Sequence, residues 1–324
     1  MTVRKFNYKK FIIFIAIVIL IIIGIVIGIK KAITHYNYTK SYEYKLLSIG
    51  YDEDEVKTLI HKLNESKIDE ILNRKANSNI VSLVNEKYFI YENLDKYLDY
   101  KKSNNDIDNT KIIAIINTEA DVEWLDNEKQ TDTSKEELML VNRLYGLDSS
   151  YEVEDIVTVP IKYAYEGMKV KNSILDSIIE LVDTAKEEGY TFVISSGYRT
   201  YKEQKKLYDN YANSYGKNAA DQYVARPGHS EYETGLSFDL EPYKYINKVD
   251  DIKDSEEYLW LRENAHEYGF IFRFESDKED LTGFSEDPWR LRYVGKDAAE
   301  MIYNEKICFE EYYAYFVNRG DNYE

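Results

Sequence analysis

Two polar clusters in the C-terminal half of the chain combine anion-binding side chains with turn-forming residues. The first, Ser196–Thr200, contains Arg199 and comes directly after a short apolar run that predicts a buried strand. The second, Ala225–Asp239, contains two glycines, two serines and three carboxylates. A loop after a strand can hold an arginine in place, and a guanidinium binds carboxylates through paired hydrogen bonds. This arrangement favours a site for an anionic ligand, although most loop arginines are only solvated.

The composition excludes several other classes of protein. The 324 residues include 42 basic and 59 acidic side chains, and the net charge of −17 argues against a nucleic-acid-binding protein, which needs a basic face. Cys308 is the single cysteine, which excludes an intramolecular disulfide and cysteine-rich metal sites. Four histidines leave few ways to build a histidine-rich metal centre. The 32 tyrosines fit the codon usage of an AT-rich genome; a carbohydrate-binding tyrosine surface is the alternative, but no spacing pattern supports it.

The N-terminus contains an apolar run with basic residues on both sides. Phe11–Ile29 holds no charged residue, and 19 residues of helix span about 28 Å, close to the hydrocarbon thickness of a bilayer. Four basic residues precede the run, so the positive-inside rule places the N-terminus in the cytoplasm. We therefore expect a cytoplasmic tail over 1–10, a single-pass transmembrane signal anchor over 11–29 and an extracytoplasmic remainder at the cell membrane. A cleaved signal peptide is the alternative, but no small-x-small cleavage site follows.

The middle of the chain predicts helices followed by a less regular region. Apolar residues at helical spacing predict a helical stalk over 32–105, whose first short helix Asp52 or Asp54 could cap. We expect an extended connecting region over 106–165, in which the apolar run of Lys111–Ile116 predicts a buried strand.

Residues 166–320 have the pattern of a compact α+β domain, in which helical and strand-like segments alternate with turns. The predicted strands are Phe192–Ile194, Leu236–Leu240, Phe270–Phe274 and Trp289–Val294. The predicted helices are Ile174–Ala185, Tyr201–Tyr215 and Glu256–Tyr268. Trp289 is expected to pack in the core rather than to serve as a ligand platform.

This part of the chain resembles the VanY-type family of zinc D-alanyl-D-alanine carboxypeptidases, which trim peptidoglycan stem peptides. The matching strings, in order and at family-like spacing, lie in Ser195–Gln204, Ala225–Glu231, Thr234–Asp239, Trp260–Ala265, Tyr268–Phe270 and Pro288–Gly295. The resemblance implies a small antiparallel sheet with flanking helices, the Hedgehog/D,D-peptidase-like fold. It also implies a substrate-binding role for four residues, which correspond to the positions that hold the peptide's terminal carboxylate and amides or brace that loop: Arg199, Gln204, Arg226 and Ser230.

The zinc-binding positions of the family are largely substituted in this sequence. Family members hold zinc with the His and Asp of an S-x-H-x-x-G-x-A-x-D string and the His of an E-x-x-H string, whose Glu is the general base. The three ligands fix the metal and leave an open position for water. Here Tyr232 and Arg290 stand at the two histidine positions, only Asp239 is retained, and Asp287 replaces the base.

These substitutions predict a domain without its zinc. A phenol must lose a proton before it binds a metal, and arginine stays cationic and repels one. We therefore expect no cofactor, and we expect the Arg290 guanidinium to occupy the metal position, paired with Asp239 and close to the Tyr232 hydroxyl. An improvised metal site of His229, His266 and Asp239 is a weaker alternative.

The sequence therefore predicts a membrane-anchored pseudoenzyme that binds peptidoglycan stem peptides or a cell-envelope protein. One alternative is an active carboxypeptidase that removes the C-terminal D-alanine with altered ligands or no metal. A further alternative is a purely structural interaction partner.

Overall fold

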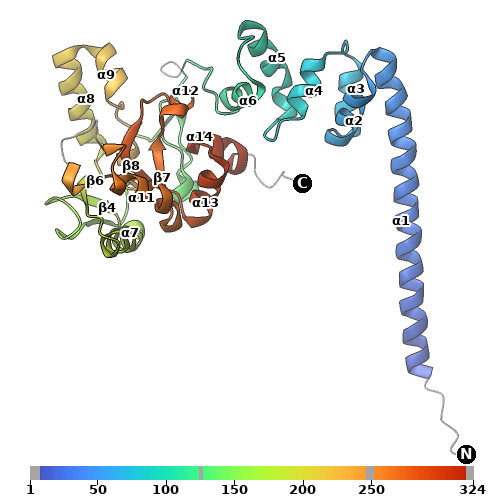
Figure 1. Cartoon of the computed structure of the whole chain (residues 1–324), viewed down its shortest axis with the longest axis horizontal. Coiled ribbons are helices and arrows are strands. Elements are labelled where there is room, and N and C mark those ends of the chain that lie inside the picture. Colours follow the sequence, from blue (N-terminus) through green and yellow to red (C-terminus); the bar gives the residue numbers. More distant parts are fainter. Residues whose placement is uncertain (1–7, 124–126, 246–251, 319–324) are drawn as a thin grey trace, which may run out of the picture. The chain divides into compact units, whose positions relative to one another are not determined.

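The computed structural model describes residues 8–123, 127–245 and 252–318, and the chain divides into two compact units, Met1–Thr110 and Lys111–Glu324 (Figure 1). The described part of the first unit is helical. Its helices are α1 (Tyr8–Ile49), α2 (Glu53–Lys62), α3 (Glu65–Leu72), α4 (Ser78–Val84), the 3₁₀ turn η1 (Tyr91–Asn93) and α5 (Leu94–Ser103).

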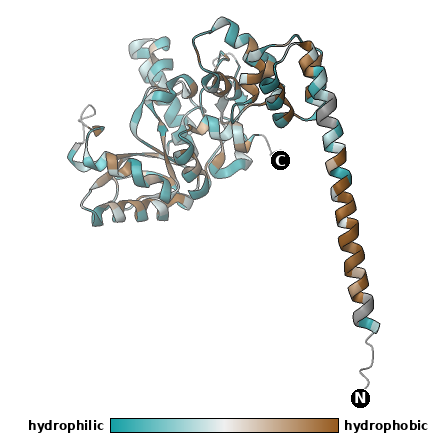
Figure 2. Cartoon of the chain, turned by 45° about the vertical axis from the view of Figure 1, so that its right-hand side comes forward, coloured by the Kyte–Doolittle hydropathy of each residue, from teal (hydrophilic) through white to brown (hydrophobic). Residues whose placement is uncertain are grey.

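Helix α1 carries the apolar N-terminal run, which is brown in Figure 2. Among the described residues, α1 is the one helix that is long and apolar enough to cross a membrane, over Ile13–Ile49. Its apolar side chains are exposed, Leu20 to 67% and Ile25 to 55%, as those of a lipid-facing helix would be. A signal sequence near the N-terminus has the same length and composition, so these properties fit a membrane anchor and a signal equally.

The short helices that follow α1 form as their capping and apolar spacing predict. Asp52 caps α2, accepting hydrogen bonds from the amides of Asp54 and Glu55, while Glu55 bonds back to the Asp52 amide at 3.0 Å. This capping box satisfies amides that the first helical turn leaves without partners. The inward faces build a small core of buried side chains: Leu46, Val56, Leu59, Ile68, Ile71, Ile80, Leu83 and Tyr97.

The second unit begins within α6 (Asn109–Asn117), and because this segment is a helix, the strand predicted at Lys111–Ile116 was wrong. All five residues of Ile112–Ile116 are buried. A short apolar run buried on every side carries no periodicity, so its sequence does not separate a strand from a helix. The segment up to residue 165 has little regular structure, with the 3₁₀ turn η3 (Thr133–Leu138) and strands β1 (Lys129–Gln130), β2 (Tyr145–Gly146) and β3 (Ile156–Thr158).

A four-stranded antiparallel sheet organises the rest of the unit, in the order β5 (Phe192–Ser196), β6 (Ser237–Pro242), β8 (Asp287–Tyr293) and β7 (Phe270–Phe274). All four predicted strands are therefore present, and the α+β class is confirmed. Around the sheet lie β4 (Lys169–Lys171), η4 (Asn172–Ile174), α7 (Leu175–Glu187), α8 (Tyr201–Tyr215), α9 (Lys217–Tyr223), η5 (Glu231–Thr234) and η6 (Tyr243–Tyr245). They are followed by α11 (Glu256–Asn264), η7 (Ala265–Tyr268), η8 (Ser276–Lys278), α12 (Glu279–Thr282), α13 (Lys296–Glu305), α14 (Phe309–Tyr312) and the π turn η9 (Tyr313–Val317).

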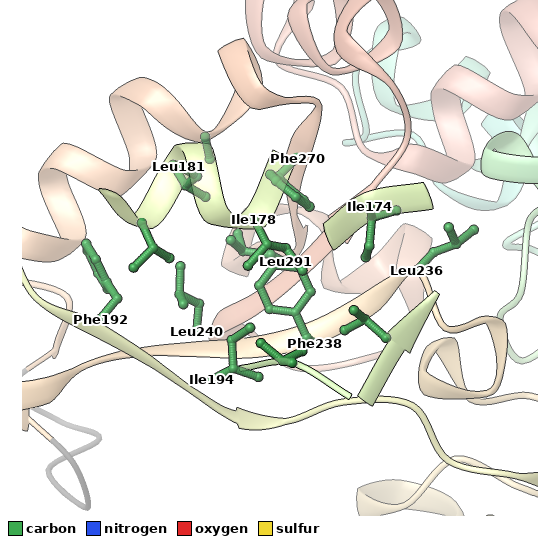
Figure 3. Close-up of a cluster of buried hydrophobic side chains, with 14 of the residues drawn as sticks. Ile174, Ile178, Leu181, Phe192, Ile194, Leu236, Phe238, Leu240, Phe270 and Leu291 are labelled. Carbon is green, nitrogen blue, oxygen red and sulfur yellow. The ribbon is translucent and has the colours of Figure 1, made fainter. Parts of the chain in front are cut away.

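The core lies between one face of this sheet and α7, with α11 and η7 also contributing (Figure 3). Side chains alternate along a strand, so Leu236, Phe238 and Leu240 enter the core while Ser237 and Asp239 point to the other face. On the neighbouring strand Leu291 pairs with Phe238 in the core. The strand residues on either side of these core residues are thereby presented on the opposite face.

Candidate functional site

A cleft of about 300 Å³ opens on the face of the sheet opposite the core. Its walls come from the β5–α8 turn, α8, the end of α9, η5 and β8. They include most of the residues predicted for the site: Arg199, Gln204, Ser230, Tyr232, Asp287 and Arg290. The structure therefore brings together residues separated by up to 91 positions in the sequence, from 199 to 290.

Sheet register places Asp239 and Arg290 side by side. Asp239 on β6 is the direct cross-strand partner of Arg290 on β8, in the antiparallel pairing that also joins Phe238 to Leu291. Directly opposed residues have their Cβ atoms about 5 Å apart and on the same face. The retained aspartate and the substituted arginine are thus neighbours because of backbone pairing, before any side-chain attraction is considered.

At the centre of the cleft, the Arg290 guanidinium, two carboxylates and the Tyr232 hydroxyl form a connected group of contacts. Arg290 Nε donates to Asp239 Oδ1 at 2.5 Å, and its Nη2 lies 2.8 Å from Asp287 Oδ2. The Tyr232 hydroxyl donates to the other Asp239 oxygen, Oδ2, at 2.5 Å. Both Asp239 oxygens are therefore engaged, and the contact predicted between Arg290 and Asp239 is present.

Burial and charge set the protonation of this centre. Burial is the main cause that raises the pKa of Tyr232 far above its ordinary value, so the phenol keeps its proton. Burial opposes the charge on Arg290, but Tyr232, Asp239 and Asp287 outweigh it and raise the arginine pKa. Burial also raises the pKa of Asp287 to about 6, against the attraction of Arg290, and its Oδ1 atom is buried without a hydrogen-bond partner.

The residues at these positions do not fit the zinc ion of the family resemblance. A zinc site needs deprotonated or neutral donors arranged around an open centre. Here the position between Asp239 and Asp287 holds a fixed cation, and the phenol of Tyr232 donates rather than accepts. Within the described residues, no group of three or more His, Cys, Asp or Glu side chains is arranged to hold a metal ion.

The two histidines of the alternative metal site lie in different environments. His229 Nδ1 contacts the Asn142 carbonyl oxygen at 2.8 Å, and the ring lines the cleft. His266 stacks on Tyr303, with ring centroids 3.8 Å apart, and lines a separate cavity of about 500 Å³. The structure does not bring the pair together at Asp239.

One wall of the cleft carries an arginine with no carboxylate partner. Arg199 follows β5, where the capping box of Thr200 and Glu203 starts α8. Its guanidinium carbon lies 4.0 Å from the centre of the Tyr232 ring, and its Nη1 is 3.5 Å from Gln204 Oε1. Over the ranges that the structure describes, no Asp or Glu forms an ion pair with Arg199. Its charge therefore faces the cleft with stacking and a long hydrogen bond as its support.

The loop that carries Ser230 is held by a buried carboxylate. Glu233, 3% exposed, accepts hydrogen bonds from the amides of Gly228 at 2.9 Å and Ser230 at 3.3 Å. Gly228 has φ +89°, and a Cβ there would lie 2.8 Å from the Leu147 carbonyl oxygen, so only glycine fits. Burial raises the pKa of Glu233 to about 7, although these amides and Arg199 favour its ionised form.

Arg226 lies beside the cleft rather than in its lining. Its Nε and Nη2 donate to the two oxygens of Asp221, at 2.7 and 3.0 Å, and Tyr208 donates to the same carboxylate at 2.6 Å. This bidentate pair ties the loop that carries Ser230 to α9. The geometry gives Arg226 a bracing position, and any part in substrate binding stays a prediction.

A buried ionic network, not anticipated from the sequence, positions the neighbour of Tyr232. Glu231 accepts from Arg273 Nε at 2.7 Å, from Arg292 and from Ser237 Oγ at 3.0 Å, and Arg273 also pairs with Glu310 at 2.6 Å. Both arginine side chains are 0% exposed. Arginine in the otherwise apolar strand Phe270–Phe274 was the signal for such a network, because a buried arginine needs carboxylates.

Apolar and aromatic side chains that sequence reasoning did not assign to the site form the outer walls of the cleft. Leu207 and Tyr223 line it from α8 and α9, and Phe284 and Trp289 from the other side. Trp289 is half-buried and lies outside the main core, so the prediction that it packs there was wrong. Trp289 lies two positions from the core residue Leu291, but the pairing of β7 with β8 shifts register between Phe272 and Phe274, so the alternation that would place Trp289 on the core face is interrupted.

Comparisons with known proteins agree with this arrangement. The family model of VanY, D-alanyl-D-alanine carboxypeptidase, matches residues 167–296. The chain is 34% identical over 223 residues to YodJ of Bacillus subtilis (strain 168), named as a carboxypeptidase, covering 67% of this chain and 81% of that protein. It is also 34% identical to a D-alanyl-D-alanine carboxypeptidase of Enterococcus faecalis, covering 57% of this chain and 68% of that protein.

The fold has a counterpart among solved structures. The LdcB LD-carboxypeptidase, whose structure was described as revealing the molecular basis of peptidoglycan recognition, superposes with a TM-score of 0.55 at 34% identity. The match covers 59% of this chain and 91% of that one. Together with the extent of the match to YodJ, these similarities show that the chain belongs to the VanY D-alanyl-D-alanine carboxypeptidase family, with a peptidoglycan-related function.

Proposed function

We propose that this chain is a membrane-anchored, extracytoplasmic member of the family that binds peptidoglycan stem peptides without zinc-dependent cleavage. The observation that carries the proposal is the closed centre of the cleft, where Arg290 donates to Asp239 and pairs with Asp287. A cation supplied by the chain neutralises carboxylates that would otherwise be buried and unpaired. It replaces the charge of a metal but offers no open position for water, so we derive no hydrolytic step.

The wall of the cleft supports the binding half of the proposal. Arg199, Gln204 and Ser230 line one cavity, and no Asp or Glu of the described chain forms an ion pair with the Arg199 guanidinium, although its charge favours the ionised forms of Glu203 and Glu233. A peptide's terminal carboxylate is the complementary group, and a bidentate hydrogen bond to arginine fixes its orientation. Gln204 Nε2 already donates to the Ala225 carbonyl oxygen at 2.7 Å, which leaves its oxygen near Arg199.

Helix α1 supports the anchor and the location that we propose. Its apolar segment is long enough to span the bilayer, and the basic residues before it favour a cytoplasmic N-terminus. The carboxypeptidase-like domain then lies outside the cell membrane, where the wall polymer is. A cell-envelope protein with an exposed carboxylate is the second partner class for the same cleft.

Metal analysis and a turnover assay test the loss of zinc chemistry. We expect the full chain, purified in detergent, to hold less than stoichiometric zinc and to release no D-alanine from a stem pentapeptide that ends in D-Ala-D-Ala. Stoichiometric zinc together with turnover would overturn the proposal and establish the active carboxypeptidase. A triple variant, Y232H, D287E and R290H, restores the donor types of the family, and we expect it to gain zinc binding.

Binding is tested with two peptides that differ only at their C-terminus. We expect the full chain to bind a stem pentapeptide with a free carboxylate at least tenfold more tightly than the same peptide ending in an amide. The difference measures recognition of the charge, because both peptides offer the same apolar surface. Equal affinities, or no binding of either peptide, would contradict a carboxylate site.

A further inference from the structure

Three tyrosines, two of them exposed and one half-buried, form an aromatic cluster on the hairpin of α8 and α9. The ring centroid of Tyr211 lies 4.7 Å from that of Tyr215 and 6.3 Å from that of Tyr223. Tyr215 is 70% exposed and Tyr223 is 68% exposed. We call these three residues the tyrosine patch. The two helices lie side by side in Figure 1, and the short distance between the rings of Tyr211 and Tyr223 joins one helix to the other.

Neither packing nor internal hydrogen bonding accounts for the tyrosine patch. The neighbouring Tyr208 has the structural role on this hairpin: it is 9% exposed, and its hydroxyl donates to Asp221 at 2.6 Å. The rings of Tyr215 and Tyr223, in contrast, present most of their surface to solvent. Large aromatic side chains gathered on a surface mark a recognition site more often than single exposed residues do.

The tyrosine patch is continuous with the cleft. Tyr223 belongs to the patch and also lines the cleft, next to Gln222 and close to Leu207 from α8. Tyr211 and Tyr215 do not line the cleft, so the patch extends from its wall outward along the hairpin. A ligand seated at Arg199 could therefore continue over Tyr223 onto the other two rings.

The chemistry around the tyrosine patch fits a sugar ring. A pyranose offers an apolar C–H face that packs on an aromatic ring, and hydroxyl and acetamido groups at its edge that need hydrogen bonds. Exposed neutral amides are close to these tyrosines in the sequence, at Asn210, Asn213, Asn218 and Gln222. Three rings are a small area compared with the roughly 800 Å² per partner of a stable protein interface. The patch therefore suits a saccharide better than a folded partner.

We propose that the tyrosine patch binds an amino sugar of the glycan strand that carries the stem peptide held in the cleft. This inference rests on the proposed function and adds its substrate class: the chain recognises peptide attached to glycan in preference to free peptide. Each additional stacked ring slows dissociation without a new charge, so recognition of the sugar should be insensitive to salt.

The test compares a free stem pentapeptide with the same peptide attached to its disaccharide, using the full chain in detergent and isothermal titration calorimetry. We expect the wild type to bind the glycopeptide about tenfold more tightly than the free peptide. Tyr215→Ala should remove most of this difference and leave the affinity for free peptide unchanged, because residue 215 lies outside the cleft lining. Tyr243→Ala, at a tyrosine that is 61% exposed outside the patch, is the matched control and should change neither affinity.

The outcomes separate this inference from the proposed function. A wild type that binds both ligands equally, or a Tyr215→Ala variant that keeps the preference, overturns the tyrosine patch and leaves peptide binding intact. A wild type that binds neither ligand overturns both. Far-UV circular dichroism verifies that Tyr215→Ala retains its helices, which is expected for a side chain that is 70% exposed.

Discussion

Arg290 and Arg199 both place a guanidinium close to the Tyr232 ring, 4.1 and 4.0 Å from its centre, but their charges are matched differently. Arg290 contacts the carboxylates of Asp239 and Asp287, so its positive charge is compensated within the protein. Arg199 contacts an amide and an aromatic ring and meets no carboxylate in the described chain. Arg290 therefore stabilises the domain, whereas Arg199 remains available to a ligand. Each prediction below tests one side of this difference.

The largest effect is expected from Arg290→Met, which leaves Asp239 and Asp287 buried without their cation. Removing one partner of a buried ion pair lowers the free energy of unfolding by about 3–5 kcal/mol. Chemical denaturation followed by tryptophan fluorescence measures it. The matched control is Arg262→Met, because Arg262 and Glu275 form an ion pair in which both side chains are 37% exposed. There we expect less than about 1 kcal/mol, and equal losses would contradict a closed centre.

Arg199→Ala should lower the affinity for a ligand and leave the free energy of unfolding nearly unchanged. We expect the affinity for a carboxylate-terminated stem peptide to fall about 10- to 100-fold, the range of a charge-assisted hydrogen bond. Stability should change much less than in Arg290→Met, because Arg199 forms no ion pair in the described chain and only its longer-range charge favours the ionised form of Glu233. Titration calorimetry and denaturation on the same preparation check both halves. A variant that loses stability as Arg290→Met does, while still binding peptide, would reverse the roles of the two arginines.

Tyr232→Phe removes the hydroxyl that donates to Asp239 but keeps the aromatic ring that contacts both Arg290 and Arg199. Asp239 loses one of its two hydrogen bonds but retains Arg290, so we expect a loss of about 1.5 kcal/mol in the free energy of unfolding. Peptide affinity should fall less than in Arg199→Ala, since the ring beneath Arg199 remains. A loss of binding as large as that of Arg199→Ala would show that the hydroxyl contacts the ligand.

The smallest effect is expected from Glu233→Gln, and it depends on pH. Because burial raises the pKa of Glu233 to about 7, the folded chain holds this proton more tightly than the unfolded chain, whose glutamate has a pKa near 4.3. Stability from this group is thus present at low pH and falls as pH rises from about 4.5 to about 7. Gln cannot ionise, so the variant avoids a cost of at most about 3.7 kcal/mol at pH 8, but its neutral oxygen accepts more weakly from the Gly228 and Ser230 amides. We therefore expect a net gain of about 1 kcal/mol at pH 8 and nothing at pH 4.5. Thermal denaturation at both values measures this gain, and a gain that does not depend on pH would contradict the raised pKa.

Local sequence patterns predicted most of the regular elements. The helix over Tyr201–Tyr215 and the strand over Phe270–Phe274 form with the predicted bounds, since each has a clear start or stop signal. The run at Ile112–Ile116 was assigned to the wrong element, because burial on all sides erases the periodicity. Trp289 was placed in the core because it is a large apolar residue, but the register shift between β7 and β8 interrupts the strand alternation beside it, and no local pattern predicts such a shift.

The candidate site was predictable where a residue type carries its own chemistry. Tyrosine and arginine at the two histidine positions argue against zinc whatever the fold, because neither is a neutral donor at ordinary pH. The network of Glu231, Arg273 and Glu310 was not predicted, because its members are separated by up to 79 positions and are joined only by packing.

By itself the sequence determined the apolar N-terminal run, the strands and helices of the C-terminal domain and the substitution of the family's zinc ligands. Only the tertiary structure decided that Arg290 lies beside Asp239, that Arg199 remains without a carboxylate partner in the described chain, and that Tyr211 and Tyr223 meet on adjacent helices. The reason is physical. Periodicity and side-chain chemistry are local properties of a chain, whereas strand register and helix packing join residues that no local pattern connects.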